Sequence, residues 1–192
     1  MKTCCFTGHR SRIFPFSQTD ERCGIIKKEM KMLIEAALND GFNHFIVGGA
    51  SGVDEWALEI LREMKTLVHS FSVTLAPPYP GFTDVTQGAD EIIPLSSQDD
   101  PSCFFKRNMY MVDNSQRIIA VYDEAFPVEG GTLQTLNYAK TKQITIEQLR
   151  WKKLLDGYYL HIPEKVGYKG SPAQSSFPLN EQGVFLVEAP EK

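Results

Sequence analysis

Three glycine-containing turns hold the residues with the clearest capacity for chemistry. They are Thr7-Gly8-His9-Arg10, Gly48-Gly49-Ala50-Ser51-Gly52 and the run that ends in Gly130-Gly131-Thr132. Glycine lets backbone N–H groups approach an anion with no Cβ in the way. A helix that begins directly after such a turn adds unpaired N–H donors and the positive end of its dipole. The two Gly-Gly turns therefore predict a divided cradle for a phosphate-bearing ligand.

Basic side chains lie close to the first turn. Lys2, Arg10 and Arg12 give residues 1–12 a charge of +3, although the whole chain carries −4. A guanidinium can hold a phosphate through two parallel N–H groups, so we expect Arg10 to contact the ligand. The alternative is an ion pair between Arg10 and the acidic segment Asp84–Asp100, which would be structural.

Three further polar residues have both a functional and a structural interpretation. Asp54 falls in the first turn of the helix expected after Gly52, where a carboxylate either complements the helix dipole or binds a ribose hydroxyl. Arg107 and Asn108 can reach the same cleft from the next helix, although Arg107 also fits a plain surface charge. We include all three residues in the predicted ligand site.

No residue is assigned a catalytic or metal-binding role. Hydrolysis of an N-glycosidic bond needs an acid–base or charge-stabilising group near the anomeric carbon, and Asp54 has no second carboxylate to complete a pair. The histidines at positions 44, 69 and 161 lack the spacing of metal ligands. The four cysteines contain no Cys-x-x-Cys pair and are expected to be reduced thiols.

Length and composition are those of a globular protein. The chain has 192 residues, of which 42% are hydrophobic and 23% charged, a balance that excludes disordered and fibrous classes. Its longest apolar runs are far shorter than the ~20 residues of a membrane span, and the N-terminus lacks the features of a signal peptide. We expect a soluble, cytoplasmic protein.

Strand and helix patterns alternate along the first three quarters of the chain. Strands are expected at residues 2–7, 42–47, 70–76, 117–122 and 143–147, and helices after Asp20, after Gly52, at residues 104–113 and after Gly130-Gly131. Residues 84–100 are expected to form a surface loop with a short helix. Such alternation is typical of a mainly parallel sheet covered on both faces. Each of the three glycine turns then follows the carboxyl end of a strand, where open α/β sheets bind ligands.

The pattern stops near residue 149. We therefore predict an α/β domain over residues 1–148 and a C-terminal extension over residues 149–192, packed on the domain or trailing from it. The extension contains four prolines. It could add an edge hairpin, with one strand at residues 183–187, or wrap as an ordered tail.

Several motifs also resemble a known family, the YpsA-like branch of the SLOG superfamily. They are Cys5-Phe6-Thr7-Gly8-His9-Arg10, the run Gly48–Ala57, Arg107-Asn108-x-x-Met111-Val112-Asp113-x-Ser115, Ile119-Ala120-Val121-Tyr122-Asp123 and Gly130-Gly131-Thr132-Leu133-x-Thr135 with Tyr138-Ala139. The resemblance extends over about residues 2–147. It implies a Rossmann-like, three-layer α/β/α fold and a site for a nucleotide or nucleotide-derived ligand, such as ADP-ribose or an NAD-like molecule, at the first, second and fourth strand ends.

The same resemblance leaves three functions to compare. The YpsA-like branch is regarded as ligand-sensing or regulatory, which is the function we favour. The phosphoribohydrolase relatives, including Lonely Guy proteins, carry Pro-Gly-Gly-x-Gly-Thr-x-x-Glu, whereas this chain reads Glu129-Gly130-Gly131-Thr132-Leu133-Gln134-Thr135, without the third glycine and the final glutamate. Single-stranded DNA binding, as in DprA, is disfavoured by the net charge of −4 and by the lack of a basic stripe. The partners that we consider are a small nucleotide-like ligand and further copies of this chain in a homo-oligomer.

Overall fold

The structure, a computed structural model, describes residues 1–67, 71–83, 85–124 and 130–160. The chain divides into two compact units, residues 1–150 and 151–192. In the second unit the described residues form helix α5 (Trp151–Leu160). The strand considered at residues 183–187 lies outside the described residues. No helix in the described ranges combines the length and the apolar character needed to cross a bilayer.

The first unit is built on a sheet of six parallel strands. The strands are β1 (Thr3–Gly8), β2 (His44–Val47), β3 (Ser72–Leu75), β4 (Glu91–Ile92), β5 (Arg117–Val121) and β6 (Thr145–Leu149). Their order across the sheet is β4-β3-β2-β1-β5-β6. From β1 the chain crosses in one direction to β2, and from β5 it crosses in the other direction to β6. The carboxyl ends of β1 and β5 therefore form a topological switch point.

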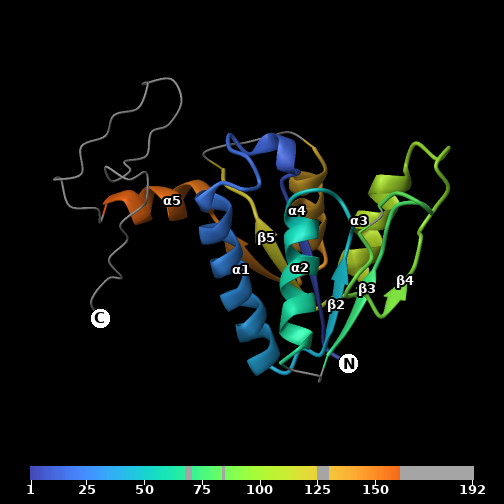
Figure 1. Cartoon of the computed structure of the whole chain (residues 1–192). Helices are drawn as coiled ribbons and strands as arrows, with labels where there is room; N and C mark the ends of the chain where they lie inside the picture. The colour runs from blue at the N-terminus through green and yellow to red at the C-terminus, as the bar shows by residue number, and fades with distance from the viewer. Residues whose placement is uncertain (68–70, 84, 125–129, 161–192) are drawn as a thin grey trace. The chain divides into compact units, whose positions relative to one another are not determined.

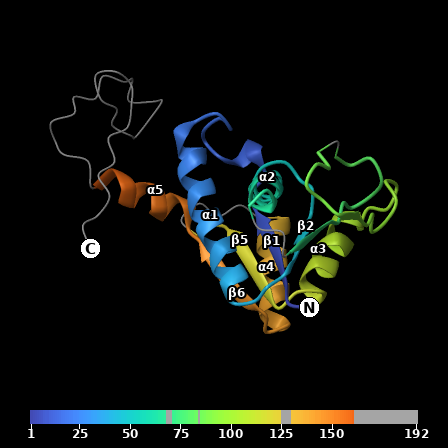
Figure 2. The same ribbon diagram turned by 60° about the horizontal axis from the view of Figure 1, so that its bottom comes forward.

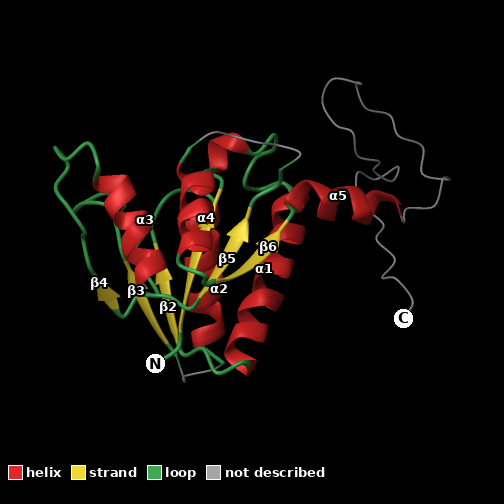
Figure 3. Cartoon of the chain, turned by 180° about the vertical axis from the view of Figure 1, so that it is seen from behind, coloured by secondary structure: helices red, strands yellow, loops and turns green. Residues whose placement is uncertain are grey.

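Two pairs of helices cover the sheet. Helices α1 (Glu21–Asn39) and α2 (Val53–Lys65) lie on the face seen in Figure 1. Helices α3 (Cys103–Asp113) and α4 (Gly131–Thr141) lie on the opposite face, seen from behind in Figure 3. The tilted view in Figure 2 shows the strands between these two layers. The predicted Rossmann-like, three-layer α/β/α architecture is thus confirmed.

Local signals in the sequence explain where α1 begins and ends. The Asp20 side chain accepts a hydrogen bond from the Arg22 N–H and caps the first turn, as expected of an aspartate at this position. Gly41 follows the helix with a φ of 82°, the left-handed conformation that commonly ends a helix. The segment 17–20 and Gly41 predict the two ends of this helix from the sequence, but the structure places Asp20 before the first turn, as its cap, instead of within that turn.

The segment before α3 differs from the prediction. Its described residues contain no helix and instead contribute the short strand β4, which pairs with β3. A strand of two residues is too short to show an alternating pattern of apolar and polar side chains, so the sequence offered no signal for it. Strand β6 also begins two residues later than expected and ends at Leu149.

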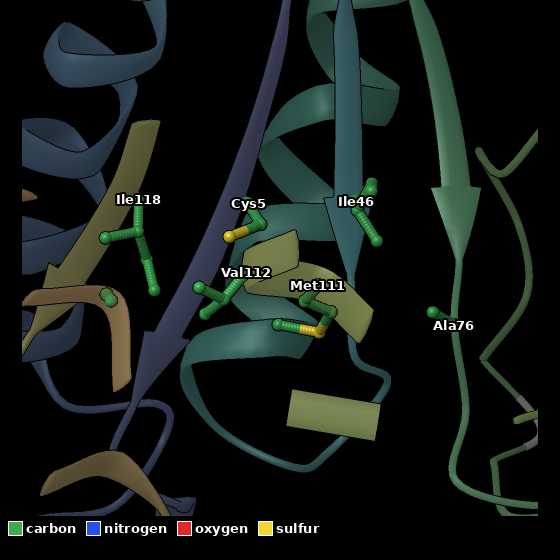
Figure 4. Packing of buried hydrophobic residues seen from close by; sticks show 7 residues of the cluster. Cys5, Ile46, Ala76, Met111, Val112 and Ile118 are labelled. Atoms are coloured by element: carbon green, nitrogen blue, oxygen red, sulfur yellow. The ribbon is translucent and has the colours of Figure 1, made fainter. Parts of the chain in front are cut away.

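Side chains from α3 and α4 pack against the sheet. Met111 and Val112 point from α3 towards the strands, as Figure 4 shows. They belong to a cluster of buried residues that also includes Cys5, Ile46, Ala76, Ile118 and Ala139. This packing fixes α3 next to the switch point, and α3 therefore carries its polar residues to that edge of the sheet.

Replacement of Met111 should measure this packing. Met111 is 2% exposed, whereas Met32, on α1, is 52% exposed. We expect Met111→Ala to reduce the free energy of unfolding by about 2–5 kcal/mol, because it removes buried methylene groups and leaves a cavity. Met32→Ala makes the same chemical change in a helix and should alter stability by less than about 0.5 kcal/mol. Urea unfolding of both variants is the measurement, and equal losses would contradict the packing.

Candidate functional site

A cavity of about 610 Å³ lies at the switch point. Its walls come from the turn after β1, the start of α2, one face of α3 and the first turn of α4. These segments are far apart in the sequence and meet because parallel strands place their carboxyl ends at the same edge of a sheet.

The cavity brings together most of the residues predicted from the sequence. Twelve of the fifteen line it, namely Thr7, Gly8, His9, Arg10, Ala50, Ser51, Asp54, Arg107, Asn108, Gly130, Gly131 and Thr132. The other three, Gly48, Gly49 and Gly52, do not line it. The three glycines of the second turn therefore have a role other than direct contact with a ligand in this cavity, whereas Ala50 and Ser51 between them line it.

Asp54 and Arg107 form a buried ion pair in the wall of the cavity. The Arg107 Nη1 donates to Asp54 Oδ2 over 2.9 Å, and the Ala50 N–H donates to the same oxygen over 3.0 Å. Asp54 is 7% exposed and Arg107 is 6% exposed. The interpretation of Arg107 as a surface charge is therefore wrong. The Asp54 carboxylate has a specific partner in addition to its place in the first turn of α2.

Gly48 makes this ion pair possible. A Cβ at this position would lie 1.7 Å from Arg107 Nη1 and 2.7 Å from Asp54 Oδ2, so any larger residue would displace the guanidinium. Gly49 has a φ of 76°, and its missing Cβ would face Leu75 and Thr83. Both glycines serve the packing behind the cavity wall.

The turn after β1 is held against the start of α2. The Val53 N–H donates to the His9 carbonyl over 3.3 Å. Gly52 has a φ of 90°, and a Cβ there would lie 2.5 Å from the Ser11 nitrogen and 2.6 Å from the His9 oxygen. At Gly8, a Cβ would overlap the Val53 side chain. Glycine at positions 8 and 52 thus allows two backbone segments of the site to approach each other closely.

The helix N-termini at the cavity differ in their free hydrogen-bond donors. Around the start of α2, the N–H groups of Ala50, Gly52 and Val53 donate to Asp54, Glu55 and His9. In the first turn of α4, the N–H groups of residues 131–133 find no acceptor among the residues that the structure describes. An anion would therefore find more free donors at α4.

Side-chain contacts also hold the first turn of α4 next to the end of β1. Thr132 Oγ1 donates to the Gly8 carbonyl over 2.8 Å and joins the first turn of α4 to the end of β1. The side-chain amide of Asn108 lies nearby, since a Cβ on Gly131 would be 3.4 Å from Asn108 Nδ2. This amide has no hydrogen bond to any described residue and faces the cavity. It is available to a ligand.

The cavity is positively charged, although the chain as a whole is negative. The charged groups among its described lining residues are three arginines, at positions 10, 12 and 107, and one carboxylate, Asp54, so their net charge is +2. Burial, followed by repulsion from Arg107 and Arg12, lowers the pKa of Arg10. A guanidinium nevertheless remains protonated at neutral pH. An anion placed among these cations would relieve their mutual repulsion.

Arg10 does not pair with residues 85–100, the described part of the acidic segment. Among the described residues it makes no ion pair, and its Cζ lies 5.1 Å from the centre of the Phe104 ring. The structural alternative considered from the sequence, an ion pair with a residue in 84–100, is therefore not found in the described part of that segment.

The sequence analysis missed an aromatic wall of the cavity. Phe104 and Phe105 line it and are 36% and 51% exposed. Positions 104 and 107 are three residues apart and so share a helix face, a signal that could have linked Phe104 to the site through Arg107. The remaining lining residues that were not predicted are Phe6, Arg12, Ile13, Pro101, Met111 and Gln134.

Neither a reactive thiol nor a metal centre lies among the described residues. All four cysteines are free and buried, and burial raises the pKa of Cys5 to about 12, so its nucleophilic thiolate form is suppressed. Burial also lowers the pKa of His9, which favours a neutral ring at pH 7. No group of three metal-binding side chains occurs in the described part of the chain.

The contact at Gly52 can be tested by substitution. Gly52→Ala should lower the free energy of unfolding by about 3 kcal/mol or more, because it adds overlap with the backbone of the first turn to the strain of a left-handed alanine. Gly41→Ala is the matched control, since Gly41 has a similar φ of 82° but open space around its missing Cβ. It should lose about 1–2 kcal/mol from strain alone. Equal losses in chemical denaturation would show that the close approach contributes nothing.

Comparison with known proteins agrees with the resemblance seen in the motifs. The UPF0398 protein OB1025 of Oceanobacillus iheyensis is 25% identical over 142 residues, covering 66% of this chain and 77% of that protein. The UPF0398 protein BH1768 of Halalkalibacterium halodurans is 24% identical over 175 residues, covering 79% and 92%. The SPbeta prophage-derived protein YoqJ of Bacillus subtilis is 29% identical over 137 residues, covering 59% and 78%.

A family model identifies the group to which these similarities belong. The YpsA model, described as the YspA SLOG family, matches residues 4–154. This range contains the whole sheet except Thr3, the first residue of β1. It also contains every described residue that lines the cavity. The chain therefore belongs to the YpsA family of SLOG proteins.

Proposed function

We propose that this protein binds a nucleotide or nucleotide-derived ligand in the cavity at the switch point and acts as a ligand sensor or regulator. The observation that carries the proposal is the convergence of three arginines and the open N-terminus of α4 on one cavity. Its described lining contains one carboxylate, that of Asp54, which is already paired with Arg107. Its volume lies in the range of about 300–1,000 Å³ that is usual for small-molecule sites. The positive charge and free N–H groups favour a phosphate-bearing ligand.

The parts of the cavity suit different parts of such a ligand. The first turn of α4 and Arg10 offer donors to phosphate oxygens. The exposed ring of Phe105 offers an apolar face for a base, as aromatic side chains do in many nucleotide sites. The Asn108 amide and Asp54 Oδ1, which has no hydrogen bond to any described residue, offer polar contacts for sugar hydroxyls.

A binding role fits the charged groups better than a hydrolytic one. Among the described lining residues, Asp54 is the one carboxylate, and its Oδ2 is occupied by Arg107 and the Ala50 N–H. No second carboxylate among the described lining residues completes the acid–base pair that glycoside hydrolysis commonly uses. The proposal also includes a cytoplasmic location, supported by four free, buried cysteines.

Substitution of Arg10 tests the binding proposal. Wild-type protein should bind ADP-ribose or AMP in a calorimetric titration, and Arg10→Gln should weaken binding by about tenfold to a hundredfold, the usual contribution of a hydrogen bond to a charged group. Arg62→Gln is the control, because Arg62 lies on α2 away from the cavity lining. Its affinity should equal that of the wild type. The binding proposal fails if neither compound binds, or if both variants bind as the wild type does.

Base release separates sensing from catalysis. We expect no free adenine when wild-type protein is incubated with AMP or ADP-ribose and the products are separated by chromatography. Adenine produced by the wild type and lost in Asp54→Asn, with ligand affinity unchanged, would replace the regulatory function with an N-glycoside hydrolase.

A further inference from the structure

We infer that Phe104 is a positioning residue that holds the Arg10 guanidinium in place for the anionic part of the ligand. The inference rests on the proposed function, since it assigns a role within the same cavity. It concerns how the protein orders a long, flexible cation before the ligand arrives.

The contact between Arg10 and Phe104 joins two separate segments. Arg10 follows β1, whereas Phe104 lies in the first turn of α3. The Arg10 Cζ is 5.1 Å from the centre of the Phe104 ring, within the distance at which a cation is attracted to an aromatic face. No ion pair or side-chain hydrogen bond links Arg10 to any other residue in the described ranges. Among the described residues, the ring is thus the direct side-chain contact that restrains the guanidinium, in addition to the longer-range attraction of Asp54.

A face contact leaves the useful donors of Arg10 free. The N–H groups of a guanidinium lie in its plane and point outward from its edge. Attraction to the ring face therefore restrains the guanidinium without pairing its N–H groups with a carboxylate or carbonyl oxygen. A restrained guanidinium loses less conformational entropy when it binds a phosphate than a freely rotating one does.

Phe104 is itself braced by two other rings. Its ring centre lies 5.5 Å from that of Phe82 at an interplanar angle of 74°, and 6.4 Å from that of Tyr79 at 76°. Tyr79 and Phe82 also meet edge to face, with centres 5.3 Å apart. These edge-to-face contacts set the orientation of the Phe104 ring. The fixed orientation of the Phe104 ring in turn restrains the Arg10 guanidinium.

The ring also offsets electrostatic repulsion inside the cavity. Arg10 lies near the positive charges of Arg107 and Arg12, which disfavour its charged form. The negative face of an aromatic ring attracts a cation without neutralising it. Phe104 can therefore hold Arg10 among other cations, whereas a carboxylate partner would cancel the charge that the ligand needs.

The neighbouring Phe105 provides the comparison. It lines the same cavity and is 51% exposed, but no arginine in the described part of the chain lies over its ring. Loss of either phenylalanine removes apolar surface from the cavity. Loss of Phe104 alone should also release Arg10.

A double-mutant cycle with ADP-ribose as the probe tests the inference. Phe104→Leu should weaken binding by about threefold to thirtyfold, the range of a cation–π contact. Phe104→Tyr keeps the aromatic face and should restore near-normal affinity. In an Arg10→Gln background the effect of Phe104→Leu should fall to that of Phe105→Leu, the loss of apolar surface, because the residue that it positions is gone. Phe105→Leu should have the same effect in both backgrounds.

The outcomes distinguish this inference from the function on which it rests. If the wild type binds neither ADP-ribose nor AMP, the proposed function is overturned, and the inference falls with it. Binding by the wild type together with additive losses for Phe104→Leu and Arg10→Gln overturns the inference alone, because Phe104 would then act directly on the ligand. Thermal unfolding of each variant checks that Phe104→Leu remains folded. If it does not, Phe104→Met, which also removes the aromatic face, takes its place in the cycle, and the same outcomes apply.

Discussion

The buried ion pair between Asp54 and Arg107 is the constraint on which the cavity depends. It joins α2 to α3 across the end of β2. Both side chains are buried, so each charge depends on the other for compensation. Removal of one partner from a buried pair commonly costs about 3–5 kcal/mol, because the other charge is left uncompensated. The pair holds the two helices at one spacing, and the cavity opens between the elements that it fixes.

The ion pair also determines how charge is distributed around the ligand site. It neutralises Arg107, so the excess positive charge comes from Arg10 and Arg12 on the opposite segment. The buried Nε of Arg107 has no hydrogen-bond partner among the described residues. The free donors of the α4 N-terminus lie on another side of the same space. A phosphate-bearing ligand thus meets donors from several elements instead of one continuous loop.

The turns contribute to this arrangement chiefly by allowing close packing. Gly8 and Gly52 let the segment after β1 contact the start of α2, and Gly48 gives Arg107 room to reach Asp54. The turn before α2 and the first residue of that helix use the N–H groups of Ala50, Gly52 and Val53 in such contacts, whereas α4 keeps those of its first turn free of acceptors among the described residues. Two similar Gly-Gly sequences therefore perform different tasks, one structural and one suited to an anion.

Much of the fold could be predicted from local signals. Asp20 and Gly41 mark the ends of α1, and apolar runs mark the longer strands. The site was harder to predict, because the role of a glycine depends on which distant atom approaches it. Nothing near Gly48 in the sequence indicates that Arg107 occupies the space of its missing Cβ. The contact of Arg10 with Phe104 likewise joins residues 94 positions apart, which only the tertiary structure brings together.

The brevity of β4 has a consequence for association between molecules. An edge strand exposes unpaired backbone groups that can pair with a strand of another chain. Here the edge strand has two residues, begins with Glu91, and is followed after one further residue by Pro94, which has no N–H to donate. This edge therefore offers too little continuous backbone for sheet extension. Any self-association by strand pairing would have to use another part of the sheet.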